Sequence, residues 1–311
     1  MWLGNLANFI AELGENGRAN EYLEHFLAIC REVGDHYREA QVLVNLAGLR
    51  VEIGQNARAL EYTEQALQIH REIKSQRGEA TVLVNLGGLY TLLGRPDEAL
   101  RCVTEGLAIA HDTGHRFIEA GACGQMAEVH VSQDNWSEAA RELEQAIEIA
   151  DDIGAPQISK WAREIFALVN VYQNNLAAAR ELVEAARKYD VPLRNYSTSA
   201  MLGVVALRQA ELNTAREAFT GAIDDASRLI ALTPDRYAAL DVKGLSLCGL
   251  ALCGDPTQIP AAKAAYSAAR AVTSEAGITR KVLQEFDALA QADADGILAE
   301  VRPVAAGVKS E

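Results

Sequence analysis

Apolar residues recur at three- and four-residue spacing along most of the chain, in pairs of segments that a short turn separates. Residues 35–74 show the pattern clearly. The first segment of this stretch carries an apolar stripe made of Leu43, Leu46, Ala47 and Ile53, and the second carries Ala59, Tyr62, Ala66, Leu67 and Ile69. The next 40 residues repeat the arrangement. Each stretch therefore predicts two amphipathic helices joined as a hairpin.

The hairpins follow one another with a fixed period of 40 residues. Gly14, Gly54 and Gly94 mark it, and Asp134, Asn174 and Gly254 continue the series. A small residue follows five positions later, at Ala19, Ala59, Ala99, Ala139 and Ala179. Short side chains allow two helices to approach closely. A period of this size indicates an array whose units contact mainly their neighbours, so that function lies along an extended surface.

The pattern predicts an all-α, superhelical solenoid of about seven hairpins. We expect repeat units near 1–34, 35–74, 75–114, 115–154, 155–193, 194–233 and 234–278. First helices are expected near 2–13, 37–52, 77–92, 117–132, 157–172, 195–211 and 235–252, and second helices near 17–32, 57–73, 97–112, 137–152, 176–188, 215–231 and 261–275. A capping helix is expected within 279–299, and residues 300–311 are expected to be disordered.

Composition excludes several classes of protein. The formal net charge of -14 opposes binding to nucleic acid, and no run of 18 apolar residues predicts a membrane span. The amino terminus shows helical amphipathicity and no secretory signal, which favours the cytoplasm. The five cysteines lie inside helical patterns, where a reduced, buried thiol is expected.

The third unit resembles a tetratricopeptide repeat. It carries Leu83, Leu86, Gly87, Tyr90, Gly94, Ala99 and Gly106 at the positions of that family's pattern, and the resemblance extends over residues 1–278. The period is 40 instead of 34, and Arg31, Arg71 and His111 stand where the family has a proline. Similar long repeats occur in kinesin light chain, in spindle-orientation scaffolds and in the sensor regions of bacterial STAND-type regulators. The resemblance implies a right-handed superhelix lined by first helices, and it names no ligand.

The resemblance places a set of polar and small residues on the inner groove. Asn5, Asn45 and Asn85 are one period apart, and Gln125 takes the fourth place. A carboxamide offers a donor and an acceptor, so a ladder of them can pair with an extended peptide backbone. The predicted peptide-binding residues are Asn5, Gln41, Asn45, Gly48, Asn85, Gly88, Gln125 and Glu128, and Gly124 is a further site of close approach. The alternative is that the asparagines bond to neighbouring helices and set the angle between repeats.

The groove is expected to become apolar beyond the fourth unit. The same inner positions there hold Trp161, Ile165, Leu168 and Tyr172. An exposed apolar patch of this kind marks a site for a side chain or an amphipathic helix. Alternatively, a tightly wound superhelix buries these residues within itself.

No motif predicts chemistry. The chain lacks a phosphate-binding loop, paired-cysteine metal spacing and a Gly-x-Ser-x-Gly turn. His111 and His115 are four residues apart, but Gly114 is expected to break the helix between them. We therefore expect no catalytic residue, metal or cofactor. An enzyme would need titratable residues that converge in one pocket.

These observations favour a non-catalytic scaffold that binds a protein or peptide in its concave groove. The partner is expected to be neutral or basic, because the inner positions are neutral or acidic, and neither nucleic acid nor membrane is expected to be one. Because the first unit begins almost without a leader, we expect the sensor or interaction region of a larger bacterial regulator. The alternative function is a module that senses a small molecule in the apolar second half. The sequence indicates no oligomeric state.

Overall fold

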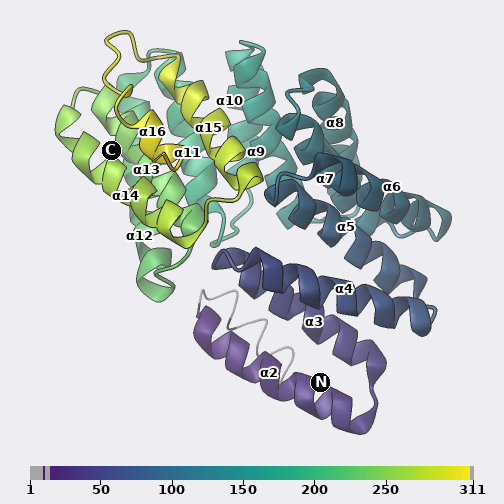
Figure 1. The fold of residues 1–311 in the computed structure, drawn as a ribbon. Helices are drawn as coiled ribbons and strands as arrows, with labels where there is room; N and C mark the ends of the chain where they lie inside the picture. The colour runs from purple at the N-terminus through teal and green to yellow at the C-terminus, as the bar shows by residue number, and fades with distance from the viewer. Residues whose placement is uncertain (1–9, 11–14, 309–311) are drawn as a thin grey trace.

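The computed structural model describes residue 10 and residues 15–308, and all regular structure within them is helical (Figure 1). The α-helices run α2 Asn16–Val33, α3 His36–Glu52, α4 Asn56–Glu72, α5 Gln76–Leu92, α6 Pro96–Asp112, α7 Arg116–Ser132, α8 Trp136–Asp152, α9 Pro156–Tyr172, α10 Leu176–Ala186, α11 Asn195–Arg208, α12 Leu212–Leu232, α13 Tyr237–Leu252, α14 Ile259–Val272, α15 Ala276–Ala290 and α16 Arg302–Ala305. A single 3-10 turn, η1, spans Pro256–Gln258. No helix of this described part is long and apolar enough to cross a membrane.

The helices form the predicted array of hairpins, and their bounds agree with the sequence pattern to within a few residues. Each first helix from α3 to α13 packs against the second helix that follows it. The turns have the backbone conformation that the period predicts, with φ of 71° at Gly54 and 73° at Gly94. Asp134 and Asn174 adopt the same left-handed conformation without a glycine. The expected helix over 2–13, including Asn5, lies outside the described residues except for Ile10.

Small residues allow the helix pairs to approach closely. Ala59, Ala99 and Ala139 are fully buried. A Cβ atom on Gly87 of α5 would lie only 2.2 Å from the Cγ2 atom of Val103 of α6. The periodic small residues therefore shape the packing between helices, as predicted.

The residues that replace the family's proline form a series of ion pairs between repeats. Arg31 contacts Glu39 at 2.8 Å, and Arg71 contacts Glu79 at 2.7 Å one period later. In the next unit the Nδ1 atom of His111 lies 3.7 Å from Glu119. Each pair joins the end of a second helix to the start of the next first helix. The basic partners are exposed, so each pair contributes little stability and mainly sets orientation.

Helix α15 covers the last repeat, as expected, and it also extends across the inner face of the array. Phe286 meets the ring of Tyr266 of α14 edge to face, with ring centroids 6.2 Å apart. The same helix contacts α5, α7, α9, α11 and α13 (Figure 1). The Tyr172 hydroxyl donates to the backbone oxygen of Gln284 at 2.7 Å, and Gln284 Nε2 donates to the backbone oxygen of Val131 at 2.8 Å. The expected capping helix therefore occupies part of the groove.

The carboxy-terminal tail differs from the sequence expectation of disorder. Residues after α15 turn back, and α16 packs against α14 and α15. Leu298, Val301 and Ala305 are buried, and Arg302 pairs with Asp287 at 2.8 Å. Three apolar residues are too few to predict an amphipathic helix, and their burial depends on packing against α14 and α15.

The solenoid is wound tightly enough for early and late repeats to meet. Arg236, in front of α13, contacts Glu52 at the end of α3 at 2.7 Å. A Cβ atom on Gly54 would lie 3.0 Å from Thr273, and one on Gly94 would lie 2.9 Å from Ala276. These two glycines therefore provide a left-handed turn and a close approach between distant segments. The contacts divide the inner face into an open part and an enclosed part.

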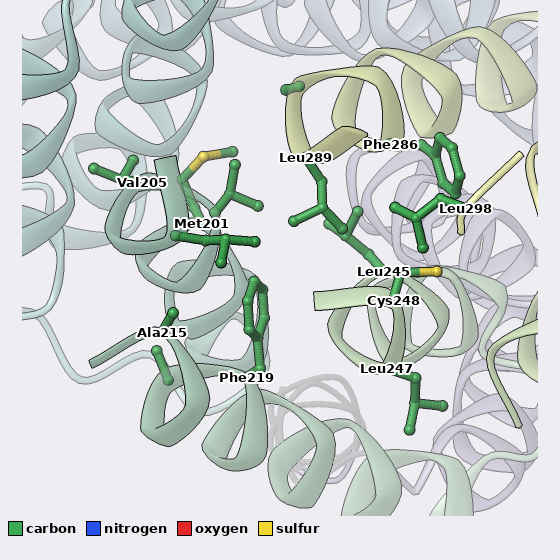
Figure 2. Packing of buried hydrophobic residues seen from close by; sticks show 14 of the residues in the cluster. Met201, Val205, Ala215, Phe219, Leu245, Leu247, Cys248, Phe286, Leu289 and Leu298 are labelled. Carbon is green, nitrogen blue, oxygen red and sulfur yellow. The ribbon is translucent and has the colours of Figure 1, made fainter. Parts of the chain in front are cut away.

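The largest apolar cluster lies in the second half of the array. Phe219 of α12 is fully buried against α11 and α13. Figure 2 shows Leu289 of α15 between Met201 and Leu245, which belong to α11 and α13. Helix α15 is thus part of the hydrophobic core.

Candidate functional site

An open hollow of about 590 Å³ lies along the amino-terminal halves of α3, α5 and α7, and we call it the outer hollow. It brings together three of the predicted peptide-binding residues, Gln41, Asn45 and Asn85. Two aromatic side chains at its rim are exposed, Tyr37 by 46% and Phe117 by 59%. The polar side chains could hydrogen-bond to the backbone of an extended segment, and the exposed rings could contact its side chains.

The part of this surface between α3 and α5 is open to solvent at Gly48 and Asn85. Asn85 is exposed, and its side chain makes no hydrogen bond among the described residues. A Cβ atom on Gly48 would meet nothing within 4 Å. Asn45 is half-buried. A ligand backbone could therefore lie against Gly48 and reach the carboxamide of Asn85.

The remaining predicted residues are engaged by the chain itself. The side-chain oxygen of Gln125 would lie 2.8 Å from a Cβ atom on Gly88, and the Trp161 ring lies 2.5 Å from the equivalent position on Gly124. Neither glycine therefore offers an open approach. Gln125 Nε2 donates to Glu128 at 3.1 Å, and Lys281 of α15 donates to the same carboxylate at 3.0 Å. Burial opposes the ionisation of Glu128, but Lys281, Arg194 and the hydrogen bond from Gln125 together outweigh it and hold the pKa of Glu128 below its usual value.

A buried histidine forms part of the floor of the outer hollow. His70 is 3% exposed, and the Tyr37 ring meets it edge to face at 5.9 Å. Its Nδ1 atom has no hydrogen-bond partner, and a Cβ atom on Gly78 would lie 2.2 Å from that atom. Burial lowers the pKa of His70, because the charged ring would lose its hydration.

We expect this histidine to make the fold sensitive to mild acid. Unfolded His70 takes up a proton near pH 6.5, whereas the folded protein resists it, so stability is lost as the pH falls below that value. The contribution is limited to one proton, or about 1.4 kcal/mol per pH unit. Urea midpoints at pH 7.5 and 5.5 should differ less in His70→Gln than in the wild type. The exposed His25→Gln control should behave as the wild type, and equal pH dependence in all three proteins would refute the assignment.

The fold buries Ile165 and Leu168 of the predicted apolar groove and leaves Trp161 and Tyr172 half-buried. Ile165 is 8% exposed and Leu168 is 5% exposed. Trp161 covers Gly124, and the Tyr172 ring stacks on Trp136 with centroids 4.2 Å apart. Two of the four predicted residues are therefore buried and two are half-buried, so they form no continuous exposed patch. The physical reason is that α15 lies over this part of the inner face.

Ile165 and Leu168 instead line a central cavity of about 210 Å³ between α5, α7, α9, α11, α13 and α15. Its apolar walls also include Leu92, Met201 and Val282. Charged and phenolic side chains interrupt them, namely Glu128, Glu164, Arg194, Tyr196, Tyr237, Asp241, Lys281 and Glu285. The cavity is therefore neither a dry void nor a simple polar channel.

Most of the charges in the central cavity are paired. Glu128 pairs with Lys281, and Glu164 accepts from Arg194 at 2.7 Å. Asp241 meets Arg270 at 2.5 Å, although burial still raises the pKa of Asp241 to about 7. Glu285 differs, because it forms no hydrogen bond or ion pair within the described chain. Burial raises the pKa of Glu285, and Lys281 opposes the shift only in part.

Apart from Glu128, the sequence reasoning missed this group of charged residues. Glu164 and Asp241 interrupt strongly apolar helices, and a charge in such a helix indicates a specific partner. Arg194, their neighbour in the cavity, comes from the irregular segment before α11, which no periodic argument reaches. Among the described residues no group of three or more His, Cys, Asp or Glu side chains is arranged to hold a metal ion.

Consecutive helix hairpins that pack on their neighbours define an α-helical repeat protein. The tetratricopeptide repeat model matches residues 1–72 and 52–112. In sequence, residues 1–112 therefore match the tetratricopeptide repeat family, and the described hairpins beyond them continue the same array. This confirms the resemblance seen in the sequence. No curated protein matches the chain.

Solved structures share the fold over most of the chain. A Rap protein complexed with competence and sporulation factor has a TM-score of 0.67 and 17% identity, over 90% of this chain and 74% of that one. The apo form of RapI has a TM-score of 0.64 and 14% identity, over 87% and 97% of the two chains. A STAND protein from Pyrococcus horikoshii with a tetratricopeptide sensor has a TM-score of 0.54 and 12% identity. The alignment covers 97% of this chain and 52% of the STAND protein.

Proposed function

We propose that the chain binds an extended peptide segment of a partner protein in the outer hollow. The observation that carries the proposal is the convergence of Gln41, Asn45 and Asn85 on one open surface beside Gly48. Carboxamides can pair with successive peptide groups whatever the side chains of the ligand are. Complex formation by a Rap protein of similar fold supports an array that acts through binding.

The chemistry of the outer hollow favours a neutral segment over a basic one. The acidic inner residue Glu128 is neutralised by Lys281, and Glu52 is paired with Arg236. No acidic residue lines the outer hollow, whereas Arg77 lines it without an ion-pair partner in the described chain. The outer hollow therefore offers no unpaired acidic side chain that would attract a basic partner. A segment that places one carboxylate near Arg77 and is otherwise uncharged fits better.

A second candidate function is the sensing of a small molecule, and the central cavity supports it. The cavity is bounded by both halves of the array and by α15, so a bound molecule would contact segments that are far apart in sequence. Occupancy could then alter how tightly the superhelix closes. This candidate uses different residues from the outer hollow, and each can be tested without the other.

The role as a sensor in a larger regulator, the cytoplasmic location and the absence of catalysis stay predictions. Sensor function within a larger regulator is supported by the fold that the chain shares with a STAND protein bearing a tetratricopeptide sensor. Cytoplasmic location rests on the reduced cysteines, and the five thiols are free. Absence of catalysis is likewise an expectation. Titratable residues do converge in the central cavity, but the Glu128, Glu164 and Asp241 carboxylates are held in ion pairs.

The peptide function is tested by selecting ligands from a displayed library of random heptapeptides on the wild-type chain. Selected peptides are then titrated against Asn85→Ala. Because one or two hydrogen bonds are lost, the dissociation constant should rise about 3- to 10-fold. The unfolding temperature should not fall, since the Asn85 side chain is exposed and unbonded and alanine has the higher helix propensity.

A matched control replaces an asparagine away from the hollow. Asn213 is exposed at the start of α12, and Asn213→Ala should bind selected peptides as the wild type does. Unchanged affinity in Asn85→Ala, or the same loss in both variants, would place the peptide elsewhere and refute the proposal.

A further inference from the structure

We propose that the central cavity is a binding site for a small primary amine with an apolar body, and that Glu285 holds its ammonium group. The inference rests on the second function proposed above and names the ligand class. It does not involve the outer hollow.

The charged residues of the cavity lining indicate that the ligand carries a cation. Glu128, Glu164 and Asp241 each have a cationic partner at 2.5–3.0 Å. Glu285 is the lining carboxylate without one in the described chain, because Lys281, one turn earlier on α15, donates to Glu128 instead. A partly buried carboxylate without a partner raises the free energy of the folded state, and a ligand cation would supply the missing ion pair.

Other unmet acceptors point to a donor-bearing ligand. The Oδ1 atom of Asp241 has no hydrogen-bond partner, although this residue is 4% exposed. The hydroxyl groups of Tyr196 and Tyr237, which also line the cavity, make no hydrogen bond within the described chain. An ammonium group carries three donors and no acceptor, so it satisfies the Asp241 carboxylate oxygen and can also donate to the phenolic oxygens, which accept as well as donate. An anion would find Arg194 and Lys281 already engaged.

The size and walls of the cavity define the rest of the ligand. Leu92, Ile165 and Leu168 belong to the apolar lining, together with Met201, Leu245, Ile278 and Val282. A cavity of about 210 Å³ exceeds the roughly 150 Å³ that accommodates benzene in an apolar protein cavity. A ring or a short aliphatic chain bearing one amine therefore fits.

The test compares three ligands of nearly equal shape on the whole chain by calorimetric titration at pH 7.5. Benzylamine is cationic, benzyl alcohol is neutral and benzoate is anionic. We expect the wild type to bind benzylamine about tenfold or more tighter than benzyl alcohol, because the hydrogen bond is charge-assisted. Benzoate should bind most weakly. This comparison needs no variant, so it remains decisive if a substitution impairs folding.

Two variants then locate the preference. Glu285→Gln keeps the side-chain shape and should reduce benzylamine binding to the level of benzyl alcohol. Asp287→Asn removes a carboxylate of the same helix that pairs with Arg302 outside the cavity lining, and it should keep the preference. Asn85→Ala should also keep it, which separates this site from the peptide function.

Each contrary result overturns the inference in a different way. Equal binding of amine and alcohol by the wild type would leave a small-molecule cavity but refute the amine class. Binding of none of the three ligands would refute the small-molecule function as well. An amine preference that persists in Glu285→Gln would show that another group holds the cation.

Discussion

Replacing Gly277 by Ala should destabilise the chain by about 3 kcal/mol and release α15 from the inner face. The new Cβ atom would lie 1.9 Å from the backbone oxygen of Thr91 and 2.7 Å from that of Leu92. Both are backbone atoms at the end of α5, so no flexible side chain can move to relieve the clash. Denaturant unfolding measures the loss, and hydrogen exchange across residues 276–290 shows whether α15 separates from the array.

The control for this change is Gly221→Ala in α12. A Cβ atom there meets nothing within 4 Å, so alanine should raise stability by roughly 0.5–1 kcal/mol through its higher helix propensity. The opposite signs expected for two Gly-to-Ala changes isolate the contact with α5. A Gly277→Ala protein as stable as the wild type would show that α15 is not held at this point.

Phe219→Ala should cost about 3–5 kcal/mol, the largest loss expected of a single truncation in this core. The ring is fully buried between two glycines, Gly203 of α11 and Gly249 of α13 (Figure 2 labels Phe219). Cβ atoms on them would lie 2.5 Å and 2.3 Å from ring carbons. The cavity left by alanine cannot easily collapse, since the glycines have no side chain to fill it. Thermal and urea unfolding measure the effect.

Gly249→Ala provides the complementary test. Alone it should destabilise the chain because its methyl group meets the Phe219 ring. Combined with Phe219→Ala, the same methyl group occupies vacated space, so the double variant should be more stable than the sum of the two losses by about 1 kcal/mol or more. Strict additivity would show that the ring and Gly249 do not pack as described.

Helix positions and turns could be predicted because their causes are local. The stripe from Leu43 to Ile53 and the turn at Gly54 depend on neighbours in the chain, and both appear as expected. The course of α15 could not be predicted, because it depends on contacts with residues more than 100 positions away, such as Tyr172 and Glu128. Periodicity reports on adjacent repeats and carries no information about such contacts.

In the candidate site, too, the residues placed by local helical spacing could be predicted, whereas those placed by contacts distant in sequence could not. Gln41, Asn45 and Asn85 share a face because they lie at helical spacing on equivalent helices, and the structure places them together. Gln125 and Glu128 obey the same spacing, but Lys281 of α15 bonds to Glu128, and Gln125 is bonded to that same carboxylate. The charged cavity escaped prediction for a related reason. Its residues come from six helices and from the segment before α11, and only winding of the superhelix brings them together.

The contact between Arg236 and Glu52 changes how the molecule should respond to shortening. In an open solenoid, removal of end repeats leaves the others nearly intact, because each repeat depends on its neighbours alone. Here the turn at Gly54 and the segment at Thr273 hold distant repeats together. Because these contacts join early and late repeats directly, truncation from either end should lower the stability of the repeats at the opposite end. Unfolding should then be all-or-none, without the gradual fraying of a linear stack.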